Sequence, residues 1–413
     1  MNLRRLIPLY LGAAMGPMGG FGIVTILPVM AQAWSVAFST AAVSITVYMI
    51  PFIVIQIFSG SIAQLFDVRR TLMFGFTLYA VGAVLSGLAP NLTLFLLFRV
   101  LQGIGAGFLT PVIMALIGEI VPPQHVGKAI GLLGVAYTIG ITFGPFLSGV
   151  IEVRLGWPWF FYFMALLAVV TAIAYWFTST PAAKPDRPTA SIKEILPMLV
   201  KAVQAPDVLL ISFAAFSLFL AYIGVMTFTA DHLKTTLSLP SDKIGTILSI
   251  TGLSGIIVSP IAGLLGDRLG RRGVFLGGAA IAVVAIALMA TIPYTFYNHL
   301  LFFLILGTGA ATAWTSLNTL AIQIAPAMRQ PVTSIYNAIK FSGYALAPAV
   351  LSLIYKRFTL TAVHAACIVA VMMAAILTLK TRSPSTWQSA MAAAPLSKGT
   401  QPSNPSTKEE NPR

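Results

Sequence analysis

The sequence is poor in charged residues. Of its 413 residues, 9% are charged and 57% are hydrophobic, whereas soluble domains carry about 25% charged residues. Such a composition cannot cover a water-soluble surface, which excludes a soluble enzyme or binding domain as the bulk of the chain. Because apolar runs recur along nearly the whole length, a lipid bilayer is the expected solvent.

Cysteine and catalytic motifs are also scarce. The single cysteine, Cys367, lies in an apolar segment, which excludes an intramolecular disulfide and a thiolate-rich metal site. The sequence has no P-loop, no HExxH motif and no serine elbow placed with a histidine and an acid. We therefore predict no enzymatic activity, no cofactor and no metal. A membrane enzyme or a non-transporting receptor stays the alternative of another class.

Acidic residues are few as well, which leaves a formal net charge of +14. The basic residues form short clusters between apolar stretches and no continuous basic face, so membrane topology explains them better than nucleic-acid binding. No nucleic acid is expected as a partner.

The apolar runs predict an all-α integral membrane protein with twelve transmembrane helices. Each run is close to the roughly 20 residues that a spanning helix needs. We expect helices over residues 6–31, 41–64, 72–89, 92–118, 128–150, 159–179, 208–230, 243–265, 274–292, 299–323, 333–354 and 360–379.

The distribution of Lys and Arg between the loops predicts the orientation. A cytoplasmic N-terminus places fifteen of the basic loop residues inside and five outside, in accord with the positive-inside rule. Because the number of helices is even, both termini are expected in the cytoplasm. We expect a multi-pass protein of the plasma membrane, in bacteria the inner membrane, and a monomer.

A repeat divides the helices into two groups of six. When the chain is shifted by 203 residues, six glycines and prolines coincide, for example Gly75 with Gly278 and Pro90 with Pro293. We expect two pseudo-symmetric six-helix bundles over residues 1–180 and 207–380, a cytoplasmic linker over 181–206 and a disordered tail over 381–413. Parallel repeats of this kind place a solute site at their interface.

Three motifs resemble those of the Major Facilitator Superfamily. The first is a turn between the eighth and ninth helices, and it contains Gly263, Asp267, Arg268, Gly270, Arg271 and Arg272. The second, in the fourth helix, contains Arg99, Gln102, Gly103 and Gly105. The third, in the fifth helix, contains Gly140, Gly144, Pro145 and Gly149 and resembles the motif of the exporter branches.

The resemblance implies the two-bundle fold of that superfamily and alternating access, and it is greatest to the twelve-helix drug:proton antiporters. The small residues of the fifth helix permit close helix approach and are expected at the contact between the halves. In the loop between the second and third helices, however, Gly60 is followed by Gln64 and Leu65 where the family has an acid and a base. Charge pairing there is expected through Asp67 or Glu119, near Arg69 and Arg70.

Acids are missing from the middle of the spans, but two cations lie there. Arg99 and Lys340 are each about two turns inside a helix, and such charges usually face a cavity or a partner. Lys340 belongs to a stripe with Tyr336, Asn337 and Tyr344, and under the repeat it corresponds to Tyr137. Our hypothesis is that both cations set the electrostatics of a solute cavity and favour an anionic or polar solute, or tune a proton site on a neighbouring group. The structural alternative has Arg99 bonded to carbonyls of the first helix and Lys340 extended to the headgroups.

Further candidates lie near the ends of spans. Asp231, beside His232, is the acid nearest to a solute path and a candidate for proton coupling. The tenth helix offers polar and aromatic groups for loose solute contact, namely Thr308, Thr312, Trp314, Thr315, Asn318 and Gln323.

The sequence as a whole predicts a secondary active transporter that exports a small amphipathic or anionic compound in exchange for protons. Many proton-driven exporters of the superfamily have a carboxylate in the first helix, where this sequence has Gly19 or Gly22. That difference and the two buried cations favour the alternative within this class, an organic-anion or metabolite carrier. Expected partners are a small-molecule solute, protons and the lipid bilayer.

Overall fold

The computed structural model describes residues 3–179, 197, 199–200, 202–324 and 329–381, and within them it contains helices and short connections but no strand. Most of the predicted linker and nearly all of the predicted tail lie outside the described residues. The helices are α1 (Leu3–Ala33), α2 (Phe38–Phe66), α3 (Val68–Leu88), α4 (Leu92–Ile120), α5 (Pro123–Leu155), α6 (Pro158–Thr178), α8 (Pro206–Thr235), α9 (Ser241–Leu269), α10 (Arg271–Thr291), α11 (Phe296–Ile324), α12 (Arg329–Arg357) and α13 (Leu360–Lys380).

Among the described residues, twelve helices are long and apolar enough to cross a membrane, which confirms the predicted fold class. The shortest spans have 21 residues and reach about 30 Å at 1.5 Å per residue, the thickness of the hydrocarbon layer. The chain is therefore a multi-pass membrane protein.

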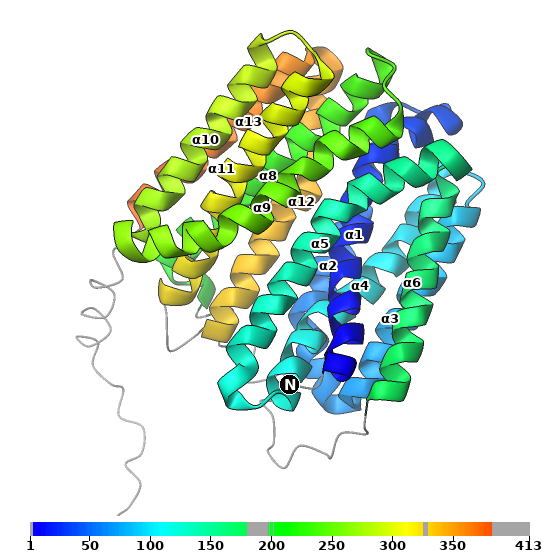
Figure 1. Cartoon of the computed structure of the whole chain (residues 1–413), viewed down its shortest axis with the longest axis vertical. Helices are drawn as coiled ribbons and strands as arrows, with labels where there is room; N and C mark the ends of the chain where they lie inside the picture. Colours follow the sequence, from blue (N-terminus) through cyan, green and yellow to red (C-terminus); the bar gives the residue numbers. More distant parts are fainter. Residues whose placement is uncertain (1–2, 180–196, 198, 201, 325–328, 382–413) are drawn as a thin grey trace, which may run out of the picture. The chain divides into compact units, whose positions relative to one another are not determined.

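The two halves repeat in their helix boundaries. α2 begins at Phe38 and α9 at Ser241, and α3 begins at Val68 and α10 at Arg271, so that both pairs differ by 203 residues. In Figure 1, α1 to α6 lie on one side and α8 to α13 on the other. The halves meet mainly along two pairs of helices, α5 with α9 and α2 with α12, and α1 adds contacts with α8 and α9.

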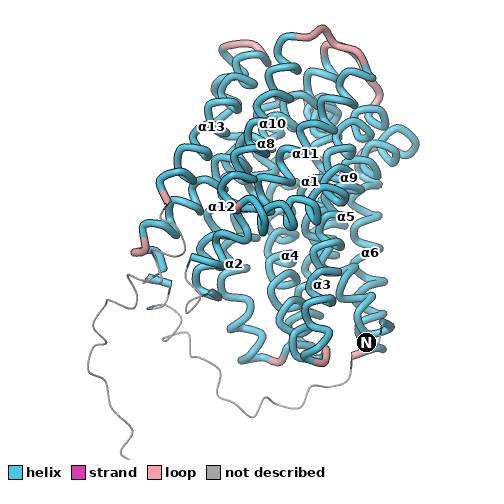
Figure 2. The backbone as a smooth tube through the Cα atoms, turned by 60° about the vertical axis from the view of Figure 1, so that its left-hand side comes forward, coloured by secondary structure: helices cyan, strands magenta, loops and turns pink. Residues whose placement is uncertain are grey.

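The connections gather at two ends of the bundle (Figure 2). We call one the Trp34 end, with the loops 34–37, 89–91, 156–157, 236–240, 292–295 and 358–359. The other is the Asp67 end, with the connections at 67, 121–122 and 270, the first turns of α1 and α8 and the last turns of α6 and α13.

Asp67 shows how tightly α2 and α3 are joined. Its backbone has φ 82°, a value that favours glycine, and its carboxylate accepts hydrogen bonds from the backbone N–H groups of Arg69 (2.7 Å) and Arg70 (3.2 Å). Such an N-cap satisfies donors that the first helical turn leaves free. The corresponding residue of the second half is Gly270, with φ 85°.

Candidate functional site

The halves are in close contact along α5 and α9 near the Trp34 end. A Cβ at Gly149 would lie 2.2 Å from the carbonyl oxygen of Ser241, and a Cβ at Gly245 would lie 2.3 Å from that of Pro145. Backbone is packed against backbone at these two points, which only a residue without a side chain permits. No opening is left between α5 and α9 here.

Aromatic rings close the same end between α2 and α12. Phe38 of the first half packs edge-on against Phe228 and Tyr355 of the second, with ring centroids 5.8 and 6.3 Å away. Deeper in the bundle, the Thr46 hydroxyl donates to the Ala345 carbonyl at 2.5 Å, and Phe21 stacks on Tyr344 at 4.9 Å. The contact therefore reaches from the Trp34 end to the middle of the helices.

A cavity of about 1070 Å³ lies between the halves beyond this contact. Its wall starts near the middle of α1, α8 and α12, at Gly20, Phe219 and Tyr344, and extends toward the Asp67 end as far as Gly118 and Ile322. Because both are within a few residues of a helix end, the cavity opens toward the Asp67 end. Its volume is that of sites for drug-sized molecules, about 300–1,000 Å³.

The wall of this cavity is largely aromatic and apolar. Among the lining residues that the structure describes, Lys340 has the one charged side chain and none has a carboxylate. The aromatic members are Phe21, Tyr48, Phe52, Tyr137, Phe219, Trp314, Phe341 and Tyr344. An amphipathic molecule fits such a wall, and Lys340 is the residue that a negative group on the molecule would pair with.

Lys340 lies in α12 with 8% of its surface exposed. Its Nζ donates to Asn337 Oδ1 at 2.7 Å and lies 4.6 Å from the ring centroid of Phe341 and 5.5 Å from that of Phe219. Within the described part of the chain it forms no ion pair. The amino group of Lys340 thus lies in the cavity wall with one hydrogen-bond acceptor and no paired acid among the described residues.

Two tyrosines of the wall have hydroxyl groups without a partner. The hydroxyl groups of Tyr137 and Tyr344 are buried, and neither has a hydrogen-bond partner among the described residues. Buried polar groups are normally bonded, and these two hydroxyl groups are exceptions in the cavity wall. Under the repeat Tyr137 of α5 corresponds to Lys340 of α12, and both line the cavity.

Arg99 does not reach the cavity, contrary to our hypothesis for this residue. It is fully buried, and its Nη2 donates to the Gly19 carbonyl of α1 at 3.3 Å while its Nη1 donates to Gln102 Oε1 at 2.6 Å. The guanidinium carbon lies 4.1 Å from the ring centroid of Tyr48, which covers it on the cavity side. This is the geometry of the structural alternative, because α1 approaches α4 closely at a glycine.

The other predicted residues, in the stripe of α12 and in α11, also fall into two groups, those that line the cavity and those that do not. Asn337 and Tyr344 line the cavity, but Tyr336 is buried behind it, with its hydroxyl bonded to Asn318 Oδ1 at 2.8 Å. From the tenth predicted helix, Trp314, Thr315 and Asn318 line the cavity.

A family comparison agrees with this architecture. The model of the Major Facilitator Superfamily matches residues 9–234 and 211–407. The chain belongs to the Major Facilitator Superfamily. Members of this superfamily carry small-molecule solutes across membranes, and this chain is therefore a membrane transporter.

Several relatives are named transporters. The chain is 24% identical to "Uncharacterized MFS-type transporter YwfA" of Bacillus subtilis (strain 168), over 84% of each chain. It is 32% identical to "Multidrug resistance protein B homolog" of Mycobacterium tuberculosis (strain CDC 1551 / Oshkosh), over 39% of this chain and 31% of the relative. It is 31% identical to "Multidrug resistance protein 3" of Bacillus subtilis (strain 168), over 25% of this chain and 20% of the relative.

The superfamily's loop motif is assembled between α9 and α10. Arg271 pairs with Asp267 and donates from Nη1 to the Gly263 carbonyl at 2.8 Å, and Arg272 donates to the carbonyl of Thr381 at the end of α13. Arg268 is exposed. These contacts tie α9, α10 and α13 together at the Asp67 end.

The matching loop of the first half is built differently from what we expected. Asp67 caps α3 with its carboxylate, and Arg69 donates to the Trp176 carbonyl at 2.8 Å and stacks 3.9 Å from the Trp176 ring centroid. Within the described residues neither Asp67 nor the exposed Glu119 forms an ion pair. Backbone donors occupy the carboxylate of Asp67, and Arg70 is exposed. Gly60 lies in the last two turns of α2.

The glycine–proline motif of α5 takes part in two helix contacts, one with α1 and one with α9. A Cβ at Gly140 would lie 2.3 Å from the Ala14 carbonyl and one at Gly144 2.8 Å from the Met18 carbonyl, both in α1 of the same half. Pro145 and Gly149 face α9 of the other half. Our prediction of a contact between the halves therefore holds for the later part of the motif.

Asp231 lies outside the cavity wall, near the Trp34 end of α8. It is 5% exposed, and its Oδ2 accepts a hydrogen bond from Tyr355 at 2.8 Å. The sequence placed it near the solute path, but the structure places it beside the closed contact of Phe38 and Tyr355.

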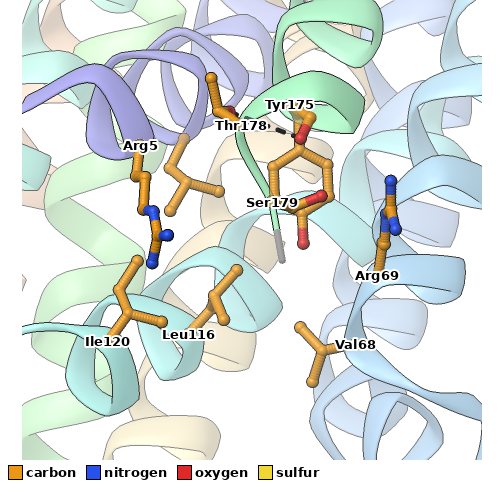
Figure 3. A pocket seen from close by; sticks show the side chains of 9 residues that line it. Arg5, Val68, Arg69, Leu116, Ile120, Tyr175, Thr178 and Ser179 are labelled. Atoms are coloured by element: carbon orange, nitrogen blue, oxygen red, sulfur yellow. Dashed lines mark hydrogen bonds between the residues drawn. The ribbon is translucent and has the colours of Figure 1, made fainter. Parts of the chain in front are cut away.

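A second cavity lies within the first half at the Asp67 end (Figure 3). Arg5 and Arg69 lie on opposite sides of it, with Tyr175 of α6 and Ser179, the residue after α6, between them. Its volume is about 40 Å³, far below the roughly 300–1,000 Å³ of sites that hold drug-sized molecules. The cavity between the halves is therefore the candidate solute site.

Sequence reasoning missed most of the aromatic wall. Phe21, Tyr48 and Phe52 of the first half line the cavity, but phenylalanine is frequent along the whole chain. Nothing in the spacing of these rings separates a cavity wall from a lipid-facing surface.

Proposed function

We propose that the chain is a secondary active transporter that exports amphipathic organic anions by alternating access. The observation that carries the proposal is the cavity between the halves, whose aromatic wall has Lys340 as its charged residue among those described. An anion with an aromatic body would pair with the ammonium group and stack on the surrounding rings.

The proposed direction of transport rests on the orientation. Basic side chains of the described residues gather at the Asp67 end, where Arg4, Arg5, Arg69, Arg70, Arg268, Arg271, Arg272 and Lys380 lie. Fewer lie at the Trp34 end, namely Arg154, Lys234, Lys243, Lys356 and Arg357. By the positive-inside rule the Asp67 end is cytoplasmic, so the cavity would load from the cytoplasm, and proton exchange would supply the energy.

Relatives and cavity size bear on the breadth of the substrates. Two relatives are named multidrug resistance proteins, and their bacterial origin supports the bacterial inner membrane as the location. A wall of rings around about 1070 Å³ suits varied amphipathic compounds. The second candidate, a carrier for one organic-anion metabolite, is favoured by the absence of a carboxylate from the described wall.

Transport of matched compounds in proteoliposomes tests the proposal. Naphthalene sulfonate, naphthol and naphthylmethylamine share a ring system and differ in charge. We expect flux of the sulfonate that is accelerated by a proton gradient, and little carrier-dependent flux of the amine. Flux of the amine in preference to the sulfonate would contradict the proposal, and a response to one small metabolite anion in place of aromatic anions would favour the second candidate.

A further inference from the structure

Asp231 is a buried acid that the solute cavity does not use. Tyr355 donates to its Oδ2 at 2.8 Å, whereas Oδ1 is buried and has no hydrogen-bond partner among the described residues. Within that part of the chain Asp231 forms no ion pair either. An ionised carboxylate in such a place is costly, because one hydrogen bond does not replace its hydration.

The residue that bonds Asp231 also takes part in closing the Trp34 end. The ring of Tyr355 packs 4.9 Å from Phe228 and 6.3 Å from Phe38, centroid to centroid. Phe38 belongs to the first half, whereas Asp231, Phe228 and Tyr355 belong to the second. Opening this end must therefore withdraw Phe38 and uncover the pair of Tyr355 and Asp231 to water.

At this end α8 and the helices packed on it carry further titratable groups, namely His232, Lys234, Asp242, Lys243, His299, Lys356, Arg357 and His364, and α5 adds Glu152 and Arg154. No titratable residue of α1 or α2 lies near the Trp34 end.

The three histidines have contacts of their own. His364 Nε2 lies 3.3 Å from the Thr229 hydroxyl and His232 Nδ1 lies 3.1 Å from that of Thr236. His299 stacks on Tyr294 at 3.4 Å between ring centroids. Tyr355 is therefore the described titratable residue with a hydrogen bond to Asp231.

We propose that Asp231 is a proton-binding site whose occupancy controls closure of the Trp34 end. A proton from water on that side adds to Oδ1 and converts the carboxylate into the neutral acid, while the Tyr355 hydroxyl stays bonded to Oδ2. No other bond is made or broken. The proposal rests on the alternating access of the proposed function.

The direction of the effect follows from linkage. The open end hydrates an ionised Asp231, whereas the closed end keeps it buried with Tyr355, whose ring packs on Phe38 and Phe228. The closed state therefore binds the proton more tightly. A ligand shifts an equilibrium toward the state that binds it better. External protons therefore close the Trp34 end and return the transporter to the state that loads at the Asp67 end.

Distances across the Trp34 end test the proposal. Spin labels are attached at Thr40→Cys in α2 and Thr361→Cys in α13, both exposed, in a Cys367→Ser background, and distances are measured from pH 8 to pH 5. We expect the ratio of closed to open molecules to rise as pH falls, by at most about tenfold per pH unit for one proton. In Asp231→Asn we expect a closed end whose ratio changes less than about twofold, because the amide mimics the neutral acid.

Two variants serve as controls. Glu152→Gln removes an acid at the same end that has no contact with this site, and it should respond as the parent does. Tyr355→Phe keeps the ring and loses the donor, and it should keep the pH response with a displaced midpoint. Retained binding of naphthalene sulfonate shows that each variant is folded.

The outcomes separate this proposal from the function it rests on. An Asp231→Asn variant with the parent's pH response, or a parent without one, overturns the proton site. If naphthalene sulfonate still changes the distance, alternating access stands and the proton site alone fails. If neither pH nor solute changes the distance, the proposed function fails as well.

Discussion

Lys340 and Arg99 carry the same charge into the membrane but have different surroundings. The ammonium group of Lys340 has one hydrogen-bond acceptor, Asn337, and lies on the cavity wall. The guanidinium group of Arg99 has two acceptors and is covered by Tyr48. Lys340 is therefore placed to bind a solute in the cavity, whereas Arg99, which bonds α1 and lies behind Tyr48, holds the fold together.

Removing the charge of Lys340 should weaken anion binding. A hydrogen bond to a charged group contributes about 1.5–3 kcal/mol, so Lys340→Gln is expected to raise the Kd for naphthalene sulfonate by about 10- to 100-fold. Lys340→Arg should bind nearly as well as the parent. Ser334→Ala, another change in the α12 part of the wall, is the matched control. Fluorescence titration measures all of them, and equal loss in the Ser334 and Lys340 variants would contradict this role.

Removing Arg99 should instead affect stability. Arg99→Ala leaves the Gly19 carbonyl and Gln102 without their donor, and buried groups left unpaired cost about 1–3 kcal/mol each. We expect a lower apparent unfolding temperature in detergent and an unchanged preference for anions among the molecules that stay folded. A stable variant with altered charge selectivity would show that Arg99 acts on the solute.

Among the helices, α5 and α9 keep the Trp34 end closed through their backbone contacts. In Gly245→Ala the new Cβ would lie 2.3 Å from the Pro145 carbonyl, a distance at which the two helices must move apart. We expect more molecules with an open Trp34 end, seen as longer distances between the labels at Thr40 and Thr361.

The control for that variant is Gly277→Ala in α10, where a Cβ meets nothing within 4 Å. Alanine there should leave the distances unchanged and favour the helix by about 0.5–1 kcal/mol. If both alanine variants gave the parent's distances, backbone contact of α5 and α9 would not be what closes this end.

The helices and their repeat could be predicted from the sequence, because a segment that is long and apolar enough forms a spanning helix in lipid. Loop details do not follow in the same way. Asp67 stands where Gly270 stands in the second half, and both have positive φ, but the side chain that compensates at Asp67 is a cap that the family motif does not contain. The expected ion pair was therefore replaced by hydrogen bonds to backbone.

The candidate site was predictable only in part. The stripe of Asn337, Lys340 and Tyr344 could be found because polar residues are rare in these spans and their spacing shares one helix face. Arg99 has the same signature in the sequence, and its burial depends on the approach of α1 at Gly19, which spacing along α4 does not reveal. For Asp231 the decisive neighbour, Tyr355, is 124 residues away.

The whole molecule has its halves joined at the Trp34 end and a cavity open toward the Asp67 end. α5 and α9, with α2 and α12, form the contact that must break if the cavity is to open on the other side. Alternating access in such repeats is a rocking of one half against the other around a central site. The unpaired charge of Lys340 lies where such a site would be.

Accessibility of two single cysteines to a membrane-impermeant thiol reagent tests this account most directly. In a Cys367→Ser background, Ser334→Cys reports on the cavity at the Asp67 end, and Thr46→Cys reports on the contact of α2 with α12. We predict that naphthalene sulfonate lowers labelling of Ser334→Cys and raises labelling of Thr46→Cys from the opposite side. If the protein binds naphthalene sulfonate but the anion changes labelling at neither position, transport by alternating access would be contradicted.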